Sequence, residues 1–255
     1  MSIYLLKNKT VPKDPYFDAF NESRYSTTFI PLLDHTHTNL PETIEFLASL
    51  EFLENYNHLI ITSQRAVEVL DLALHSVPSD TREKIFKKTA YTVGPATSKI
   101  LYALGFQFIK GGSEAGNGDI LSDIIIDDLK NCKNDKIIFF TGETRRDIIP
   151  RKLTSSGYCL TELVIYKTIL KPNIAERFTQ VYDKSAENSW IIFFSPQGTS
   201  EIIDYLNTLK VKNFKIASIG PTTEKFLLEQ GIVPNLVSSK PEATTLLQEL
   251  HKHSL

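Results

Sequence analysis

One fifteen-residue pattern occurs twice in this chain. Residues 91–105 and 217–231 each contain a short apolar run, a Gly-Pro pair, a threonine and an apolar stretch that ends in glycine. This order predicts a β-strand, a turn and a helix of about three turns that glycine closes. The match extends upstream, where residues 59–63 correspond to residues 192–195. The sequence therefore predicts two related lobes.

Strand and helix patterns alternate along both halves of the chain. Short apolar runs ending in Gly, Pro, Ser, Thr or Asn predict strands at residues 3–6, 28–32, 59–61, 90–93, 106–109, 136–140, 163–166, 191–194, 216–219 and 233–237. Apolar residues spaced three and four apart predict helices at residues 40–53, 66–74, 120–129, 150–155, 199–209 and 243–251. Such alternation indicates an α/β fold with two flavodoxin-like or Rossmann-like lobes, each a five-stranded parallel sheet flanked by helices.

Aligning the two copies predicts a circularly permuted duplication. After the second Gly-Pro turn only one strand and one helix remain, so the first strands of that lobe must come from the N-terminus. The predicted parts are a discontinuous lobe, an inserted lobe and two extended connectors, over residues 1–34 with 171–255, 40–165, and 30–39 with 166–173. Each connector carries a proline, which suits an extended chain. Two connectors predict a hinge that opens and closes.

Composition narrows the class of protein. Hydrophobic residues make up 42% and charged residues 23% of the 255 residues, which is typical of a folded globular chain. A net charge of −2 argues against a nucleic-acid-binding protein, which ordinarily has a basic face. No apolar run approaches the roughly 20 residues of a membrane helix. The apolar part of residues 1–7 is shorter than a secretory signal requires, so we expect none there. We expect a cytosolic monomer that binds neither nucleic acid nor membrane.

Common cofactor motifs are missing. No Gly-x-x-x-x-Gly-Lys phosphate loop and no complete Gly-x-Gly-x-x-Gly fingerprint occurs. His35 with His37, and His251 with His253, lie in a linker and a tail, where surface histidines are a simpler interpretation than metal ligands. The sequence predicts no metal, nicotinamide or flavin cofactor.

Polar loops follow several of the predicted strands. In residues 62–65, Ser63 can cap the following helix while Arg65 projects near its amides, and residues 195–198 repeat this with Pro196 at the first helical position. For one loop, a plain helix cap and a ligand-binding role are both open. Together with the two Gly-Pro turns, these segments make four loops at matching places in the two lobes. Four such loops favour a ligand, because ligands of open parallel sheets bind outside the carboxyl ends of the strands.

Two further segments belong to the same end of the sheets. Residues 141–146 add the cations Arg145 and Arg146, for which salt bridges with nearby acidic residues are the alternative. Tyr166 lies at the second connector, as part of the site or as a hinge-packing ring. Four helix N-termini that line one cleft would offer free amides to an anion. Because the protein is slightly acidic, local donors rather than bulk positive charge must bind such a ligand.

These segments together resemble one known family, the uroporphyrinogen-III synthases of haem biosynthesis. The resemblance runs nearly end to end, through residues 5–8, 14–16, 59–68, 93–97, 146–150, 164–168, 193–198 and 219–223. Where the family often has Ser-Pro-Arg, this chain has Ser63-Gln64-Arg65, which changes the helix start and keeps the arginine. The order and spacing of the segments carry the resemblance more than any single one does.

The resemblance implies an activity. The expected enzyme is a cofactor-independent lyase that closes hydroxymethylbilane, a linear tetrapyrrole with eight carboxylates, to uroporphyrinogen III with inversion of the last ring and loss of water. Tyr166 is the candidate catalytic residue, as a proton or hydrogen-bond donor to the departing hydroxyl. The candidate substrate-binding residues are Thr62, Ser63, Arg65, Gly94, Thr97, Gly142, Arg145, Ser195, Pro196, Gln197, Gly220, Thr222 and Thr223. The alternatives are a non-catalytic two-lobed binding protein for a small polyanion and, more weakly, a nucleotide-binding regulator.

Overall fold

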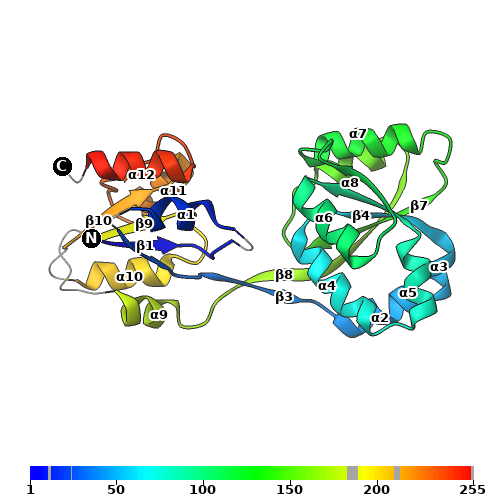
Figure 1. The fold of residues 1–255 in the computed structure, drawn as a ribbon, viewed down its shortest axis with the longest axis horizontal. Helices are drawn as coiled ribbons and strands as arrows, with labels where there is room; N and C mark the ends of the chain where they lie inside the picture. The colour runs from blue at the N-terminus through cyan, green and yellow to red at the C-terminus, as the bar shows by residue number, and fades with distance from the viewer. Residues whose placement is uncertain (11–12, 24, 183–188, 210–212, 254–255) are drawn as a thin grey trace. The chain divides into compact units, whose positions relative to one another are not determined.

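The computed structural model describes residues 1–10, 13–23, 25–182, 189–209 and 213–253. The chain divides into two compact units (Figure 1). Unit 1 contains Met1–Asp34 and Ile169–Leu255, and unit 2 contains His35–Thr168. Unit 1 is thus built from both ends of the chain, and unit 2 is inserted between them.

Unit 1 is built on a five-stranded parallel sheet. Its strands lie in the order β11-β10-β9-β1-β2, with bounds Leu236–Val237, Phe214–Ser218, Ser189–Phe193, Ser2–Leu6 and Ser26–Phe29. β1 is an inner strand of this sheet, where Tyr4 pairs with Thr28 of β2 on one side and Ile191 of β9 on the other. Its residues are apolar on both faces, as expected for a parallel strand with helices above and below.

Helices cover both faces of the unit 1 sheet. The elements are α1 (Pro15–Asn21), α9 (Ile174–Val181), α10 (Ser200–Thr208), α11 (Pro221–Glu229) and α12 (Ala243–Lys252). Tyr4 and Leu6 pack in a core with α9, α10 and α11, whereas Ile3 and Leu5 pack in a second core with α1 and α12. Successive strand residues point to opposite faces, so one strand contributes to both cores.

Unit 2 repeats this strand order and adds one strand. Its sheet runs β3-β8-β7-β4-β5-β6, with bounds Leu33–His37, Cys159–Leu170, Lys136–Gly142, Tyr56–Ile61, Thr89–Val93 and Phe108–Gly112. The five strands from β8 to β6 pair in parallel. They correspond in order to β2-β1-β9-β10-β11 of unit 1. In each sheet the order in which the chain adds strands reverses between two inner strands. These strands are β1 and β9 in unit 1, and β7 and β4 in unit 2.

The helices of unit 2 also form two layers. They are α2 (Leu40–Ala48), α3 (Leu50–Asn55), α4 (Gln64–His75), α5 (Ser79–Phe86), α6 (Pro95–Leu104), α7 (Gly118–Asp128) and α8 (Ile148–Ser155). Leu59 and Ile61 of β4 pack with helices α2 to α6, and Ile60 packs with α7 and α8. No helix in the described ranges is long and apolar enough to cross a membrane.

The two segments that cross between the units are paired. The Thr38 N–H donates to the Ile165 carbonyl over 2.9 Å, and the Lys171 N–H donates to the Leu32 carbonyl over 2.9 Å. The partner number falls as the residue number rises, so β3 and β8 run antiparallel here. Both segments lead to an asparagine with positive φ, Asn39 or Asn173, and then to a helix.

The fold class is confirmed, and three local expectations change. Two parallel sheets with helices on both faces are present, but β3 makes the second sheet six-stranded. The helix predicted over residues 40–53 is two helices, because Ser49 takes an extended conformation and caps α3 by accepting from the Phe52 N–H over 3.2 Å. Helices α1, α5 and α9 were not predicted, since they are short and two of them are polar over most of their surface.

Candidate functional site

A pocket of about 380 Å³ lies where β4 and β7 of unit 2 end. These are the neighbouring strands at which the chain progression of the sheet reverses. Open α/β sheets bind ligands at this position, outside the carboxyl ends of the strands. The pocket is lined by Thr62, Ser63, Val93, Gly116, Asn117, Gly118, Phe139, Thr141, Thr144, Arg145, Arg146, Ile148, Ile149 and Tyr166. The structure thus brings four of the predicted site residues together.

Ser63 and Tyr166 form the central hydrogen-bonded pair of this pocket. Ser63 is the N-cap of α4, as predicted, and its Oγ accepts from the Ala66 N–H over 3.1 Å. The same Oγ donates to the Tyr166 hydroxyl oxygen over 3.1 Å. A serine hydroxyl has one proton, so this arrangement uses it, and the phenolic proton of Tyr166 is left to donate elsewhere. The Tyr166 side chain is half-buried, and the residue lines the pocket.

Gly142 supports the Tyr166 ring from below. A Cβ atom added at Gly142 would stand 2.6 Å from Cζ and 2.8 Å from the hydroxyl oxygen of Tyr166. The Glu143 N–H also donates to the Tyr166 carbonyl over 3.0 Å. Position 142 therefore needs glycine because an aromatic ring lies directly on its backbone. The contribution of Gly142 to the site is therefore to leave space for the Tyr166 ring.

The two arginines of the loop after β7 differ in their partners. Arg145 forms ion pairs with Glu162 of β8 and with Asp147, the latter over 3.0 Å, and these carboxylates raise the pKa of its guanidinium. Arg146 is exposed on the pocket wall, and no ion pair connects it to any other described residue. The salt-bridge interpretation holds for Arg145, whereas Arg146 remains the cation available to a ligand.

Four pocket residues with polar side chains are absent from the candidate substrate-binding residues of the sequence analysis, namely Asn117, Thr141, Thr144 and Arg146. Asn117 is the N-cap of α7, where its Oδ1 accepts from the Asp119 N–H over 2.9 Å and the Ile120 N–H over 3.0 Å. An asparagine just before a helix pattern is a sequence signal of an N-cap.

Besides Gly142, three predicted residues of unit 2 do not line this pocket. The side chain of Arg65 pairs with Glu68 over 2.8 Å, one turn along α4. The Gly94 N–H donates to the carbonyls of Gly112 and Ala115, so it is occupied inside the protein. Thr97 is 5% exposed. Helix α6 begins after Gly94 without any side-chain cap, so amides of its first turn lack an intrahelical partner.

The predicted residues of unit 1 gather after two neighbouring strands, β9 and β10. Gly220 precedes α11, which also begins without a side-chain cap, and Thr223 in its first turn is 3% exposed. Thr222 is exposed beside it, at the second position of the same helix. The backbone at Gly220 is extended, with φ of 172°, in contrast to φ of 78° at Gly94.

The expected helix start at Ser195 is wrong. Helix α10 begins at Ser200. Ser195 is therefore not the cap of a helix, and Pro196 is not its first residue. The segment with Gln197 forms a turn instead, in which Thr199 Oγ1 donates to the Pro196 carbonyl over 2.7 Å. Gly198 has φ of 79° and packs its backbone against Leu32. This positive φ takes the chain out of a helical path and delays the helix.

Among the described residues, no group of three or more His, Cys, Asp or Glu side chains is arranged to hold a metal ion. The polar groups that line the pocket are instead hydroxyls, an amide and guanidinium groups. Such groups donate hydrogen bonds, and donors next to cations suit carboxylate or phosphate ligands.

Comparison with known proteins gives a consistent result. Residues 15–248 match the family model described as uroporphyrinogen-III synthase HemD. The chain is 42% identical over 265 residues to a uroporphyrinogen-III synthase of Saccharomyces cerevisiae, covering 97% of this chain and 94% of the relative. It is 37% identical to one of Schizosaccharomyces pombe, with 96% and 94% covered.

Solved structures show the same fold. A uroporphyrinogen-III synthetase from Helicobacter pylori has a TM-score of 0.60 at 20% identity, covering 99% of this chain and 98% of that one. A mutant uroporphyrinogen III synthase from Thermus thermophilus has a TM-score of 0.51 at 12% identity, again covering 99% and 98%. Together with the family match over most of its length, these findings show that the chain belongs to the uroporphyrinogen-III synthase family.

Proposed function

We propose that this protein closes hydroxymethylbilane to uroporphyrinogen III, with inversion of the last pyrrole ring and loss of water. The observation that carries this proposal is the 42% identity, over 97% of the chain, to a uroporphyrinogen-III synthase. Its pocket agrees with such a substrate. Hydroxyl, amide and guanidinium donors surround it, and each charge-assisted bond to a carboxylate contributes on the order of 1.5 to 3 kcal/mol.

Tyr166 is our candidate for the proton donor. Loss of the terminal hydroxyl leaves an electrophilic methylene, which the substituted carbon of the far ring attacks to form a spiro intermediate. Fragmentation and reclosure then invert that ring. The pyrrole nitrogens supply the electronic push, and the leaving hydroxyl needs a proton. Because Ser63 donates to the Tyr166 oxygen, the phenolic proton is available for that step.

The other candidate residues are proposed to bind and orient the substrate. In unit 2 we assign this role to Thr62 and Ser63, and to the start of α6, where Gly94 is the N-cap residue and Thr97 lies in the first turn. Arg145 acts indirectly, because its carboxylate partners occupy its guanidinium, and Arg65 is engaged with Glu68. Holding a flexible chain in the reactive geometry is itself a large contribution to rate.

We assign substrate carboxylates to unit 1 as well. The proposed contacts are Gly220, Thr222 and Thr223 at the start of α11, and Ser195, Pro196 and Gln197 in the turn before α10. The uncapped start of α11 supports this role, because its amides have no side-chain acceptor. Replacing Thr223 with a bulky residue should weaken product binding, and an unaltered affinity would count against this assignment.

The decisive experiment is an isomer assay. Freshly made hydroxymethylbilane closes without catalyst to the uninverted type I isomer. Incubation with the protein should give the type III isomer, separated by chromatography after oxidation to the porphyrin. Type I alone would support the non-catalytic binding protein instead and would reject the proposed activity.

We further propose that the protein works as a cytosolic monomer without nucleic acid. A net charge of −2 provides no general attraction to a polyanionic nucleic acid. Light scattering coupled to gel filtration should give a mass near 28.9 kDa. A mass of twice that value would reject the monomer.

A further inference from the structure

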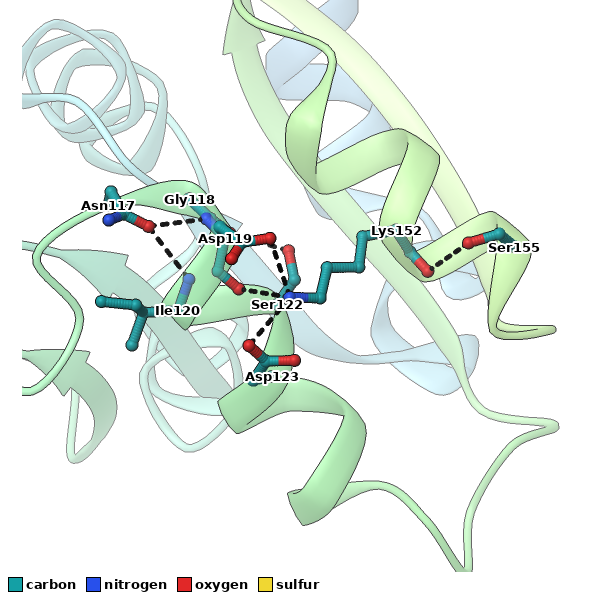
Figure 2. A network of polar contacts seen from close by, with 8 residues as sticks. All are labelled: Asn117, Gly118, Asp119, Ile120, Ser122, Asp123, Lys152 and Ser155. Atoms are coloured by element: carbon teal, nitrogen blue, oxygen red, sulfur yellow. Dashed lines mark hydrogen bonds and ion pairs between the residues drawn. The ribbon is translucent and has the colours of Figure 1, made fainter.

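We propose that Asn117 is a further substrate-binding residue of the unit 2 pocket, and that Lys152 is the positioning residue that holds it there. This inference rests on the proposed function. It concerns the part of the pocket lining that is formed where α7 and α8 begin. Figure 2 shows the polar contacts that join these two helices.

The side chain of Asn117 has a fixed orientation. Its Oδ1 accepts from two amides of α7, at 2.9 Å from the Asp119 nitrogen and 3.0 Å from the Ile120 nitrogen (Figure 2). These bonds determine which end of the amide group faces the helix. The Nδ2 group, with two donor hydrogens, faces away from the helix amides, and no bond joins it to another described residue. Asn117 lines the pocket, so these donors are available to a carboxylate there.

Helices α7 and α8 contact each other at the pocket through Gly118. A Cβ added to Gly118 would stand 3.1 Å from Cγ1 of Ile149, which also lines the pocket. The start of α7 therefore lies close against the start of α8, and a side chain at position 118 would require Ile149 to move. Any shift between the two helices would move Asn117 relative to Arg146 and Tyr166.

Lys152 joins the same helices one turn further on. Its Nζ donates to Asp119 Oδ1 over 2.8 Å, to the Asp119 carbonyl over 3.2 Å and to Asp123 Oδ2 over 2.8 Å (Figure 2). All three ammonium protons are used. Asp119 is also the residue whose amide orients Asn117. Lys152 thus restrains the residue that fixes the Asn117 side chain, without itself lining the 380 Å³ pocket.

The test of Asn117 separates its two roles. In Asn117→Asp and Asn117→Ser, an oxygen that can cap α7 remains and the donor group is lost. We expect the melting temperature to stay near that of the wild type and the KM for hydroxymethylbilane to rise about tenfold, with kcat changed less. The control is Asn131→Asp, an exposed residue of the turn after α7, which makes the same charge change and should leave KM unaltered.

The test of Lys152 uses a conservative rescue. Lys152→Gln should raise KM about threefold with little change in kcat, and Lys152→Arg should restore most of the difference, because a guanidinium can still reach both carboxylates.

An unchanged KM in both Asn117 variants would overturn the assignment of Asn117. A rise in Asn117→Asp alone would also overturn it, because charge repulsion rather than a lost donor would then be the cause.

For Lys152, an unchanged KM in Lys152→Gln would overturn the positioning role. A wild-type protein that yields only the type I isomer would instead reject the proposed function, so the two failures are distinguishable.

Discussion

The loops after β1 of unit 1 and β7 of unit 2 differ, although these two strands hold corresponding places in the strand order of their sheets. In unit 1, β1 leads to α1 through Asp14, which is 1% exposed and caps the helix through the amides of Tyr16 and Phe17. In unit 2, β7 leads to α8 through Asp147, which is exposed, makes no cap bond and pairs with Arg145 and Arg151. The β1–α1 loop of unit 1 thus contains a buried aspartate that caps a helix, whereas the β7–α8 loop of unit 2 contains a solvent-exposed aspartate that forms ion pairs.

The serine loops differ in the same way. Ser63 caps α4 and contacts Tyr166, whereas the backbone after Ser195 makes a turn before α10 begins at Ser200. Duplication of a strand order therefore preserves where loops are placed and not what their side chains do. In unit 2 the loops present groups to a pocket, and in unit 1 the first loop is fixed by its own buried side chain. This difference can be tested at matched positions.

The largest expected effect concerns the pocket that unit 2 has at its central strands. Tyr166→Phe removes the phenolic proton and keeps the ring that packs on Gly142. Turnover of hydroxymethylbilane to the type III isomer should fall by roughly 100-fold, which is the lower end of the contribution of a general acid, while product binding changes little. Tyr102→Phe is the control, because Tyr102 is 74% exposed in the same unit. Undiminished turnover in Tyr166→Phe would remove this residue from the mechanism.

The second prediction compares the two aspartates. Asp14→Asn should lower the free energy of unfolding by about 3 kcal/mol, because it leaves Lys7 without the carboxylate that it contacts at 2.5 Å. Asp147→Asn should change it by less than about 0.5 kcal/mol, as for exposed ion pairs. Urea denaturation of both variants measures the difference. Equal effects would contradict the comparison.

The aspartate pair also has a pH dependence. Hydrogen bonds from Lys7 and from the amides of Thr10 and Phe17 outweigh the effect of burial, and they lower the pKa of Asp14 to about 2. A folded-state pKa below the unfolded value stabilises the protein above pH 4, and this stability is lost as the pH falls towards 2. The stability gap between wild type and Asp14→Asn should therefore shrink below pH 4.

The third prediction uses the two Gly-Pro turns. Gly94 has φ of 78° and ψ of 151°, a region that only glycine occupies readily, whereas Gly220 is extended. An added Cβ meets nothing within 4 Å at either position, so backbone strain alone separates them. Gly94→Ala should destabilise the protein by about 2 kcal/mol and Gly220→Ala by much less. Similar melting temperatures for the two variants would show that the turns are equivalent.

The smallest effect is expected at the two serines. Ser63→Ala removes the cap of α4 and should lower the free energy of unfolding by about 1 kcal/mol. Ser195→Ala removes no cap, because α10 begins five residues later, and should be close to neutral. Denaturant titration of the two variants measures this directly. A loss at Ser195 as large as at Ser63 would indicate a structural role that its turn does not account for.

Much of the fold follows from local patterns. The repeated strand, Gly-Pro turn and helix identify β5 with α6 and β10 with α11, and the N-cap role of Ser63 is confirmed. The break at Ser49 was not predicted, because the apolar spacing continues through it while the serine hydroxyl starts a new helix. Pro196 was a good first helical residue by its chemistry, but the positive φ of Gly198 keeps the chain out of a helix there.

The sequence by itself determined the duplicated architecture, because apolar spacing and turn residues act within a few positions of one another. The tertiary structure alone decided which side chains meet. Ser63 contacts Tyr166 across 103 positions, Arg145 pairs with Glu162 on the next strand, and Lys152 reaches Asp119 on another helix. Such partners depend on the register of strands and the packing of helices, which local propensity does not encode. For this reason Arg145 and Arg146 are alike in the sequence and different in the folded protein.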